Sequence, residues 1–201
     1  MNMKCSSLLQ RNSQPPEMRR SFGILFIAVS LAIVLGTVFS ELGASYNVPV
    51  YDHIIIWLAS FGLTFGTSYR KFRRVIVSVR LRMKNSLEWP LTAKILNGLC
   101  WAAPFASIAA LPSLYQYLIL TGIGLGNFST FLLTKKYSGF ESREQAIVGS
   151  LCIAFIPVTF GISSTTLLAL NHNVIMLLSR IFIALSYAVG GIYAVQVKEL
   201  S

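Results

Sequence analysis

Long apolar segments separated by short polar connectors constrain this chain more than any other feature. A helix needs about 20 mostly apolar residues to cross the ~30 Å hydrocarbon core of a bilayer. Backbone in lipid must satisfy its own hydrogen bonds, which favours helices. The sequence therefore predicts an all-α, polytopic integral membrane protein with six transmembrane helices in three hairpins. The six segments are Phe22 to Phe39, Val50 to Tyr69, Leu91 to Leu111, Leu114 to Thr134, Ala146 to Leu170 and Val174 to Val195.

The composition agrees with a membrane protein. Hydrophobic residues make up 54% of the chain and charged residues only 12%, whereas soluble domains carry about 25% charged residues. The net charge of +10 would suggest nucleic acid as a partner of a soluble protein. In a polytopic protein an excess of lysine and arginine instead reports cytoplasmic loops, so no nucleic-acid partner is expected.

Two connectors are short enough to predict helical hairpins. Pro112 and Ser113 separate the third and fourth segments, and residues 171–173 (NHN) separate the fifth and sixth; both are turn-forming sequences. The second segment is the least certain of the six. Asp52 and His53 lie near its start, and it becomes polar at its end.

The basic residues predict the orientation, because they accumulate in short cytoplasmic loops. With six crossings, every lysine and arginine except Arg180 falls on one side of the membrane. The opposite connectors contain none. We therefore expect a cell-membrane protein with both termini in the cytoplasm, a polar basic tail over residues 1–20 and a transmembrane domain over residues 21–201. The basic residues of the cytoplasmic side are Lys4, Arg11, Arg19, Arg20, Arg70, Lys71, Arg73, Arg74, Arg80, Arg82, Lys84, Lys94, Lys135, Lys136, Arg143 and Lys198.

The transmembrane domain includes a basic amphipathic linker over residues 70–90. As a helix, this linker gathers its apolar residues on one face and most of its cations on the other. That pattern favours a helix in the cytoplasmic interface, with Arg70 to Lys84 on anionic lipid headgroups. The alternatives are a simple topological anchor and, from Val77 to Met83, a short strand of period two.

The first apolar segment has a second interpretation as a cleaved signal. Val38 and Ser40 suit a cleavage site, and Arg19 to Phe22 partly resemble a twin-arginine signal. The segment is at the long end for a signal, and its flanking arginines are also what a retained cytoplasmic anchor needs. A retained helix is therefore favoured.

Little in the sequence suggests catalysis. Cys5, Cys100 and Cys152 are odd in number and widely spaced, so neither a disulfide framework nor a CxxC site is available. Two histidines and seven carboxylates form no metal-binding motif of the HExxH kind. We expect no enzymatic activity, no cofactor and no metal.

Glycine motifs lie in the second and fourth segments. Gly62 and Gly66, and Gly122, Gly124 and Gly126, have the spacing that lets helix backbones approach closely in lipid. They predict contact between these two helices, or between either helix and a second subunit of a homo-oligomer or membrane complex.

Polar residues follow these glycines. Asn127, Ser129 and Thr130 belong to the fourth segment, and Asn97 lies at a similar depth in the third. Asn97 and Asn127 are therefore candidates for lining a solute path. Pro104 and Pro157 lie near mid-membrane and predict kinks, either for bending alone or around a transport site.

Arg180 is the one basic residue that the orientation does not explain. It lies about seven residues into the sixth segment, with no acidic residue in that segment. Asp52, His53 and His172 are predicted at the same outer rim and complete a candidate solute or ion site with Arg180. The guanidinium has three alternatives: it reaches the outer headgroups, pairs with Asp52 or Glu41, or binds a passing anion.

These features favour a small-solute transporter or channel with a polar path through the bundle. The alternative is a non-catalytic accessory, scaffold or assembly subunit of a membrane complex. Neither the solute nor the oligomeric state follows from the sequence.

Overall fold

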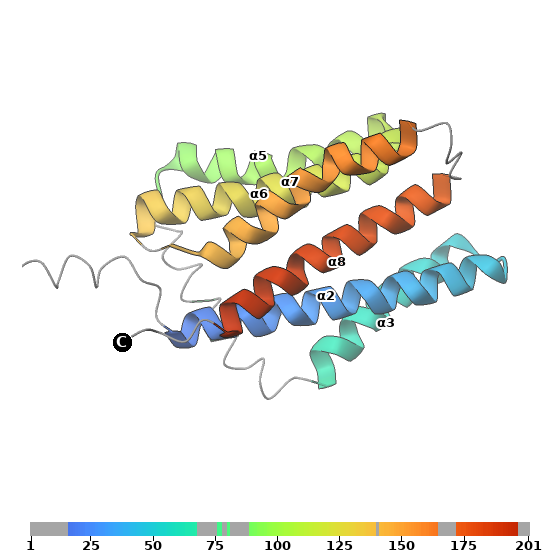
Figure 1. The fold of residues 1–201 in the computed structure, drawn as a ribbon, viewed down its shortest axis with the longest axis horizontal. Helices are drawn as coiled ribbons and strands as arrows, with labels where there is room; N and C mark the ends of the chain where they lie inside the picture. The colour runs from blue at the N-terminus through green and yellow to red at the C-terminus, as the bar shows by residue number, and fades with distance from the viewer. Residues whose placement is uncertain are drawn as a thin grey trace, which may run out of the picture.

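The computed structural model describes residues 16–67, 76–77, 80, 89–139, 141–164 and 172–196. Over these residues the chain is all-helical and contains no strand, which confirms the predicted class. A short turn, η2 (Pro112–Leu114), joins two of the long helices, and a single π turn, η3 (Thr134–Ser138), follows another. The six long helices are α2 (Pro16–Ser45), α3 (Val50–Thr67), α5 (Leu91–Ala110), α6 (Tyr115–Leu133), α7 (Arg143–Ser164) and α8 (His172–Gln196) (Figure 1).

Five of the described helices are long and apolar enough to cross a membrane. The five comprise all the long helices except α3. This helix has 18 residues, which rise about 27 Å at 1.5 Å per residue. Its sequence was the least certain of the six segments, because Asp52 and His53 fall within its first turn and a half.

Three helices, α2, α7 and α8, begin before the apolar runs that predict them. α2 begins at Pro16, with Glu17 in its first turn, and continues to Ser45. Residues 16–20 of the expected polar tail therefore belong to this helix. Counting apolar residues misses such ends, because Arg19, Arg20 and Glu41 are good helix formers that only interrupt the apolar pattern.

Most of the basic linker lies outside the described residues. Ile76, Val77 and Arg80 are helical and exposed, and the other positions from 68 to 88 fall outside the described ranges. The expected contact of Arg70 to Lys84 with anionic headgroups stays a prediction.

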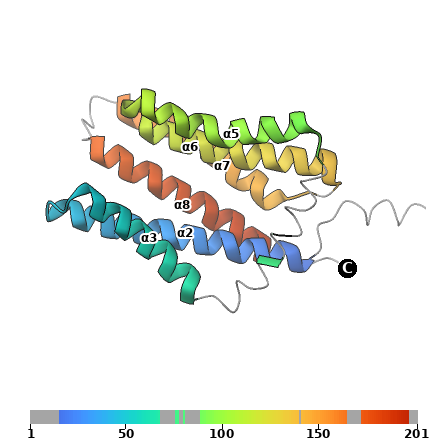
Figure 2. The same cartoon turned by 180° about the vertical axis from the view of Figure 1, so that it is seen from behind.

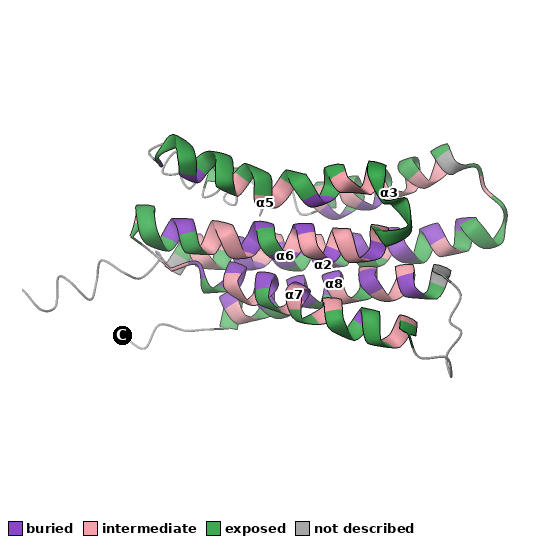
Figure 3. Cartoon of the chain, turned by 90° about the horizontal axis from the view of Figure 1, so that it is seen from above, coloured by how far each residue is buried: buried purple, intermediate pink, exposed green. Residues whose placement is uncertain are grey.

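The helices form an open row of neighbours. α3 packs mainly against α2, α2 packs against α8, α8 also packs against α7, α7 packs against α6, and α6 packs against α5 (Figures 1 and 2). A smaller contact joins α6 to α8. α5 and much of α3 are exposed (Figure 3), and the buried residues of α5 are Ala93 and Pro104. The two outermost helices thus each leave one face unpacked.

The bundle has two ends, named here by one arginine at each. At the Arg19 end, α2, α5 and α7 begin and α6 and α8 end (Figure 1). At the Arg180 end, α2 ends and α3 and α8 begin. The main core lies between the two ends and is formed by residues of α2, α6, α7 and α8. Its buried members are Phe22, Phe26, Ile33, Leu120, Val148, Cys152, Ile183, Ala184 and Tyr187.

Glycines set the closest approaches between helices. A Cβ built on Gly191 of α8 would lie 2.9 Å from the carbonyl oxygen of Gly23 in α2. A Cβ built on Gly149 of α7 would lie 2.7 Å from the backbone nitrogen of Phe128 in α6. Real Cβ atoms do not come this close to backbone, so larger residues at Gly191 or Gly149 require the helices to separate.

We predict that Gly191→Ala destabilises the protein by about 2 kcal/mol, because the added methyl group pushes α8 away from the α2 backbone. The measurement is the free energy of unfolding in mixed micelles titrated with a denaturing detergent. Gly62→Ala is the matched control, since a Cβ there meets nothing within 4 Å, and alanine is the better helix former. An equal loss in both variants would contradict this packing.

Candidate functional site

The candidate site is built around Arg180, about two turns into α8. Long side chains on a helix point back toward its N-terminus. The guanidinium therefore extends toward the Arg180 end, where α2 ends. Its side chain is 14% exposed, so the arginine is covered mainly by neighbouring helices.

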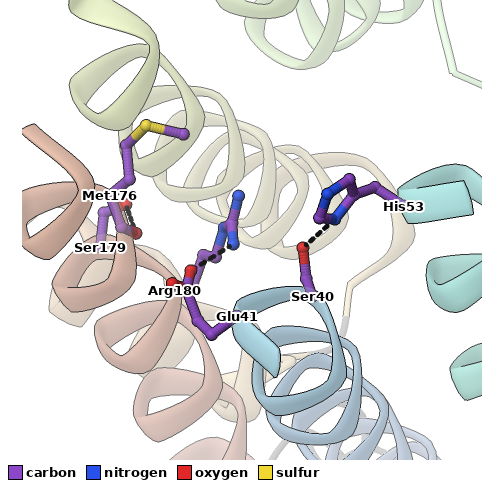
Figure 4. A network of polar contacts seen from close by, with 6 residues as sticks. All are labelled: Ser40, Glu41, His53, Met176, Ser179 and Arg180. Atoms are coloured by element: carbon purple, nitrogen blue, oxygen red, sulfur yellow. Dashed lines mark hydrogen bonds and ion pairs between the residues drawn. The ribbon is translucent and has the colours of Figure 1, made fainter. Parts of the chain in front are cut away.

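Two residues of neighbouring helices hold the guanidinium. Nη1 donates a hydrogen bond of 3.3 Å to Oε1 of Glu41 on α2, which completes an ion pair (Figure 4). The Arg180 guanidinium carbon also lies 5.7 Å from the centre of the Trp57 ring on α3, a cation–π distance. Arg180 thus joins α2, α3 and α8 at this end.

A second polar pair lies beside the first. Oγ of Ser40 on α2 and Nδ1 of His53 on α3 are 2.8 Å apart. Ser40 precedes Glu41 in the chain, so the two pairs are neighbours on α2 (Figure 4). Ser40 is buried and His53 is partly buried. The result is a polar cluster of Ser40, Glu41, His53 and Arg180, which we call the outer cluster.

Two buried polar atoms of this region have no hydrogen-bond partner. One is Nε of Arg180, and the other is Oγ1 of Thr37, which lies one helical turn before Glu41 on α2. Buried polar groups are nearly always paired, so an unpaired one calls for a ligand, a water molecule or strain. The outer cluster therefore retains unused hydrogen-bonding capacity on both α2 and α8.

The outer cluster contains only part of the predicted set. Of the two predicted acidic partners, Glu41 pairs with Arg180, and no ion pair to Asp52 occurs among the described residues. Asp52 instead lies in the first turn of α3, where the helix dipole stabilises a carboxylate. The side chain of His172 is outside the described residues.

Asn97 and Asn127 lie in two separate helix interfaces. Oδ1 of Asn97 on α5 accepts hydrogen bonds from Ser129 at 2.8 Å and from Thr130 at 3.0 Å, both on α6. Asn127 is 2% exposed and donates to the Ile123 carbonyl at 2.9 Å and to the Tyr187 hydroxyl on α8 at 3.3 Å. The structure brings neither residue to the outer cluster. Each holds two helices together.

The predicted glycine motifs differ in their surroundings. On α6, Gly122 and Gly126 face Phe105 and Trp101 of α5, and Gly124 faces α7. On α3, Gly62 and Gly66 have nothing within 4 Å. The expected contact between α3 and α6 within one chain is therefore wrong, because α3 lies at the far side of α2. Contact of the α3 glycines with a second subunit stays a prediction.

The two prolines are both inside helices. Pro104 lies in α5 and is buried, and Pro157 lies in α7 and is exposed. Each removes one backbone hydrogen bond from its helix. The expected kinks stay a prediction.

Sequence reasoning missed one buried carboxylate. Glu144 is fully buried in the first turn of α7, although the apolar run was expected to begin only at Ala146. Ser142 and Gln145 beside it are also buried, and Oγ of Ser142 donates to Oε1 of Gln145 at 3.0 Å. The available signal was the spacing of Ser142 and Gln145, which is a helix N-capping pattern.

Glu141 is the centre of a charged network at the Arg19 end. Its carboxylate accepts from Nζ of Lys135 at 2.6 Å and from Nε of Arg143 at 2.9 Å. The Lys135 ammonium, followed by the Arg143 guanidinium, holds the pKa of the Glu141 carboxyl below its ordinary value of 4.5.

Comparison with known protein families, curated proteins and solved structures gives no match to this chain. Within the described ranges, no three histidine, cysteine, aspartate or glutamate side chains gather as metal ligands would.

We predict that the Glu141 network makes the stability of the protein depend on pH below about 4.5. The folded state lowers the Glu141 pKa, so its stabilisation is complete above the unfolded value and is lost as the pH falls through the folded value. Glu141→Gln or Lys135→Gln should reduce the slope of unfolding free energy against pH in this range. Lys136→Gln is the control, because Lys136 carries the same charge as Lys135 without bonding to Glu141. An unchanged slope in Glu141→Gln would contradict the assignment.

Proposed function

We propose that this chain is a multi-pass membrane transporter or channel whose outer cluster binds a small anionic solute. Arg180 carries the proposal, as a largely covered guanidinium held by one long bond to Glu41. An arginine within a transmembrane helix costs about 2.5 to 3.5 kcal/mol near its centre and is a functional candidate by default.

The pairing with Glu41 leaves most of the guanidinium unused. A guanidinium has five N–H donors, and its strong carboxylate pairs are bidentate at about 2.7 to 2.9 Å. Arg180 makes one bond of 3.3 Å, and its buried Nε has no partner. A carboxylate or phosphate in this place would form shorter and more numerous hydrogen bonds. The chemistry of Arg180 thus favours an oxyanion with two acceptor atoms.

Glu41 acts in this proposal as an internal competitor of the solute. Its side chain is 41% exposed, so it can turn toward water when an anion takes the guanidinium. Ser40 and His53 lie next to the pair and supply further hydrogen-bonding atoms. The binding step therefore needs side-chain exchange at the end of α2 and no separation of the core helices.

Asn97 and Asn127 are not assigned to the solute route. Their side chains bond to neighbouring helices, so opening a path beside them would break those bonds. The polar path expected from the sequence is replaced in this proposal by a binding site between α2, α3 and α8.

The proposal places the protein in the cell membrane with six crossings and both termini in the cytoplasm. The support is that α2 and α5 begin at the same end of the bundle, and that α3 starts at the opposite end and runs back along part of α2 (Figure 1). Arg19, Lys135 and Arg143 lie at that end, as basic residues of a cytoplasmic side do. The Arg180 end then faces outward.

We predict that Ser45→Cys reacts with a membrane-impermeant thiol reagent in intact cells, whereas Lys136→Cys reacts only after permeabilisation. Both residues are exposed, at opposite ends of the bundle. The background carries serine at Cys5, Cys100 and Cys152. Labelling of Lys136→Cys in intact cells would reverse the orientation.

An accessory subunit of a membrane complex is the second candidate. One observation favours it: Gly62 and Gly66 of α3 face open space, and this spacing suits close contact with a further helix. Cross-linking of Gly62→Cys to a second protein in native membranes, together with absent solute flux, would favour this function over transport.

We predict that substitutions of Arg180 and Glu41 have opposite effects on anion transport into liposomes that contain the purified protein. Arg180→Gln should lower the uptake of acetate or phosphate at least tenfold, since a charged hydrogen-bonding partner contributes about 1.5 to 3 kcal/mol. Glu41→Gln should raise the apparent affinity, because the competing carboxylate is gone. Uptake is measured with radiolabelled anions at fixed internal volume.

The sign of the Glu41→Gln effect separates binding from structure. If the ion pair is only structural, both variants lose stability and neither gains affinity. Trp57→Leu is the matched control, because it removes the cation–π contact and leaves all charges in place. Absent flux of every anion in a well-folded wild type would overturn the transport proposal.

A further inference from the structure

A second charged cluster lies at the opposite end of the bundle, far from the outer cluster. Arg19 of α2 stacks on the Tyr193 ring of α8, with 4.9 Å between the guanidinium carbon and the ring centre. Arg143 of α7 also interacts with the Tyr193 side chain. Glu141 then links Arg143 to Lys135. These five residues, which we call the inner belt, cross the ends of α2, α6, α7 and α8.

The inner belt contains more positive than negative charge. Lys135 and Arg143 share one carboxylate, that of Glu141. Arg19 forms no ion pair among the described residues, and its buried Nη2 has no hydrogen-bond partner. Arg20 beside it is exposed and adds a further cation. Glu17 is exposed in the first turn of α2, and Glu144 is buried in the first turn of α7. Among the five belt residues, Arg19 is thus the cation without a carboxylate partner.

The position of the belt matches the headgroup region of a bilayer. Arg19 is near the start of one candidate span and Arg143 begins another, whereas Lys135 and Tyr193 are near the ends of two more. Tyrosine is typical of this depth, because its ring is apolar and its hydroxyl is polar. Basic residues here attract anionic lipids at about 1 kcal/mol each.

We propose that the inner belt binds the phosphate of an anionic phospholipid between Arg19 and Arg143, beside Tyr193. The guanidinium of Arg19 is planar and is oriented by the ring beneath it, which suits directed hydrogen bonds to phosphate oxygens. The lipid phosphate supplies the missing negative charge of the belt. The bound lipid bridges the starts of α2 and α7, which both pack against α8. This site is independent of the proposed solute transport.

The test titrates the purified full chain in detergent micelles with phosphatidylglycerol, phosphatidylcholine or inorganic phosphate. The midpoint of thermal unfolding reports binding. Phosphatidylglycerol should raise the midpoint, whereas phosphatidylcholine and inorganic phosphate at equal concentration should not. Arg19→Gln should weaken the apparent affinity for phosphatidylglycerol about fivefold, the effect of one cation near an anionic surface.

Arg20→Gln is the matched control, since it removes an adjacent and exposed cation of the same charge. It should change the affinity less than twofold. Arg143→Gln should match Arg19→Gln, and it also protects the test against misfolding, because the Arg143 side chain is 66% exposed. Equal losses in Arg19→Gln and Arg20→Gln would overturn the site in favour of diffuse surface attraction.

The two sources of phosphate give different outcomes. A rise in the midpoint with inorganic phosphate alone, equal to that with phosphatidylglycerol, would overturn the lipid as the ligand. An equal rise with phosphatidylcholine would show that acyl chains stabilise the protein without headgroup recognition, and it would also overturn the proposal.

Discussion

Close contact between helix backbones is the constraint on which the rest of this structure depends. In a bilayer, lipid tails are as apolar as the side chains, so the hydrophobic effect does not drive helices together. They associate through van der Waals packing and interhelical hydrogen bonds. Gly23 against Gly191 and Gly149 against α6 provide the packing. The hydrogen bonds of Asn97 and Asn127 tie α6 to α5 and α8. Both charged clusters are held at the ends of helices that these contacts position.

The two charged clusters differ in how their positive and negative charges are paired. In the outer cluster, one cation and one carboxylate balance in number but pair weakly, since Arg180 and Glu41 share a single bond of 3.3 Å. In the inner belt, Glu141 is paired tightly by two cations, and the imbalance lies at Arg19. The first arrangement supports the proposed replacement of Glu41 by an anionic solute, and the second supports the proposed binding of a lipid phosphate beside Arg19.

The helical class followed from the sequence because each apolar run must satisfy its backbone internally. The sequence also indicated that α3 is less apolar than the other long helices, because Asp52 and His53 lie near its start. The choice of helix partners was not visible, because Gly62 and Gly122 carry the same kind of motif, yet only Gly122 meets another helix of this chain. The sequence left two carboxylates, Asp52 and Glu41, as possible partners of Arg180. Glu41 is the partner because α2 packs against α8. Burial of Glu144 escaped detection, because a single polar residue at a helix start has no apolar periodicity.

The place of α8 in the row of helices has a consequence for biogenesis. It packs against α2 on one side and against α7 and α6 on the other. Gly191 lies against α2, and Gly190 lies against α7. It is also the last of the described helices in the chain. Two groups of helices therefore emerge from the ribosome before α8: the first is α2 and α3, and the second is α5, α6 and α7. Until α8 is inserted, these two groups have no main interface with each other. The insertion of α8 then joins the two groups into one row of helices.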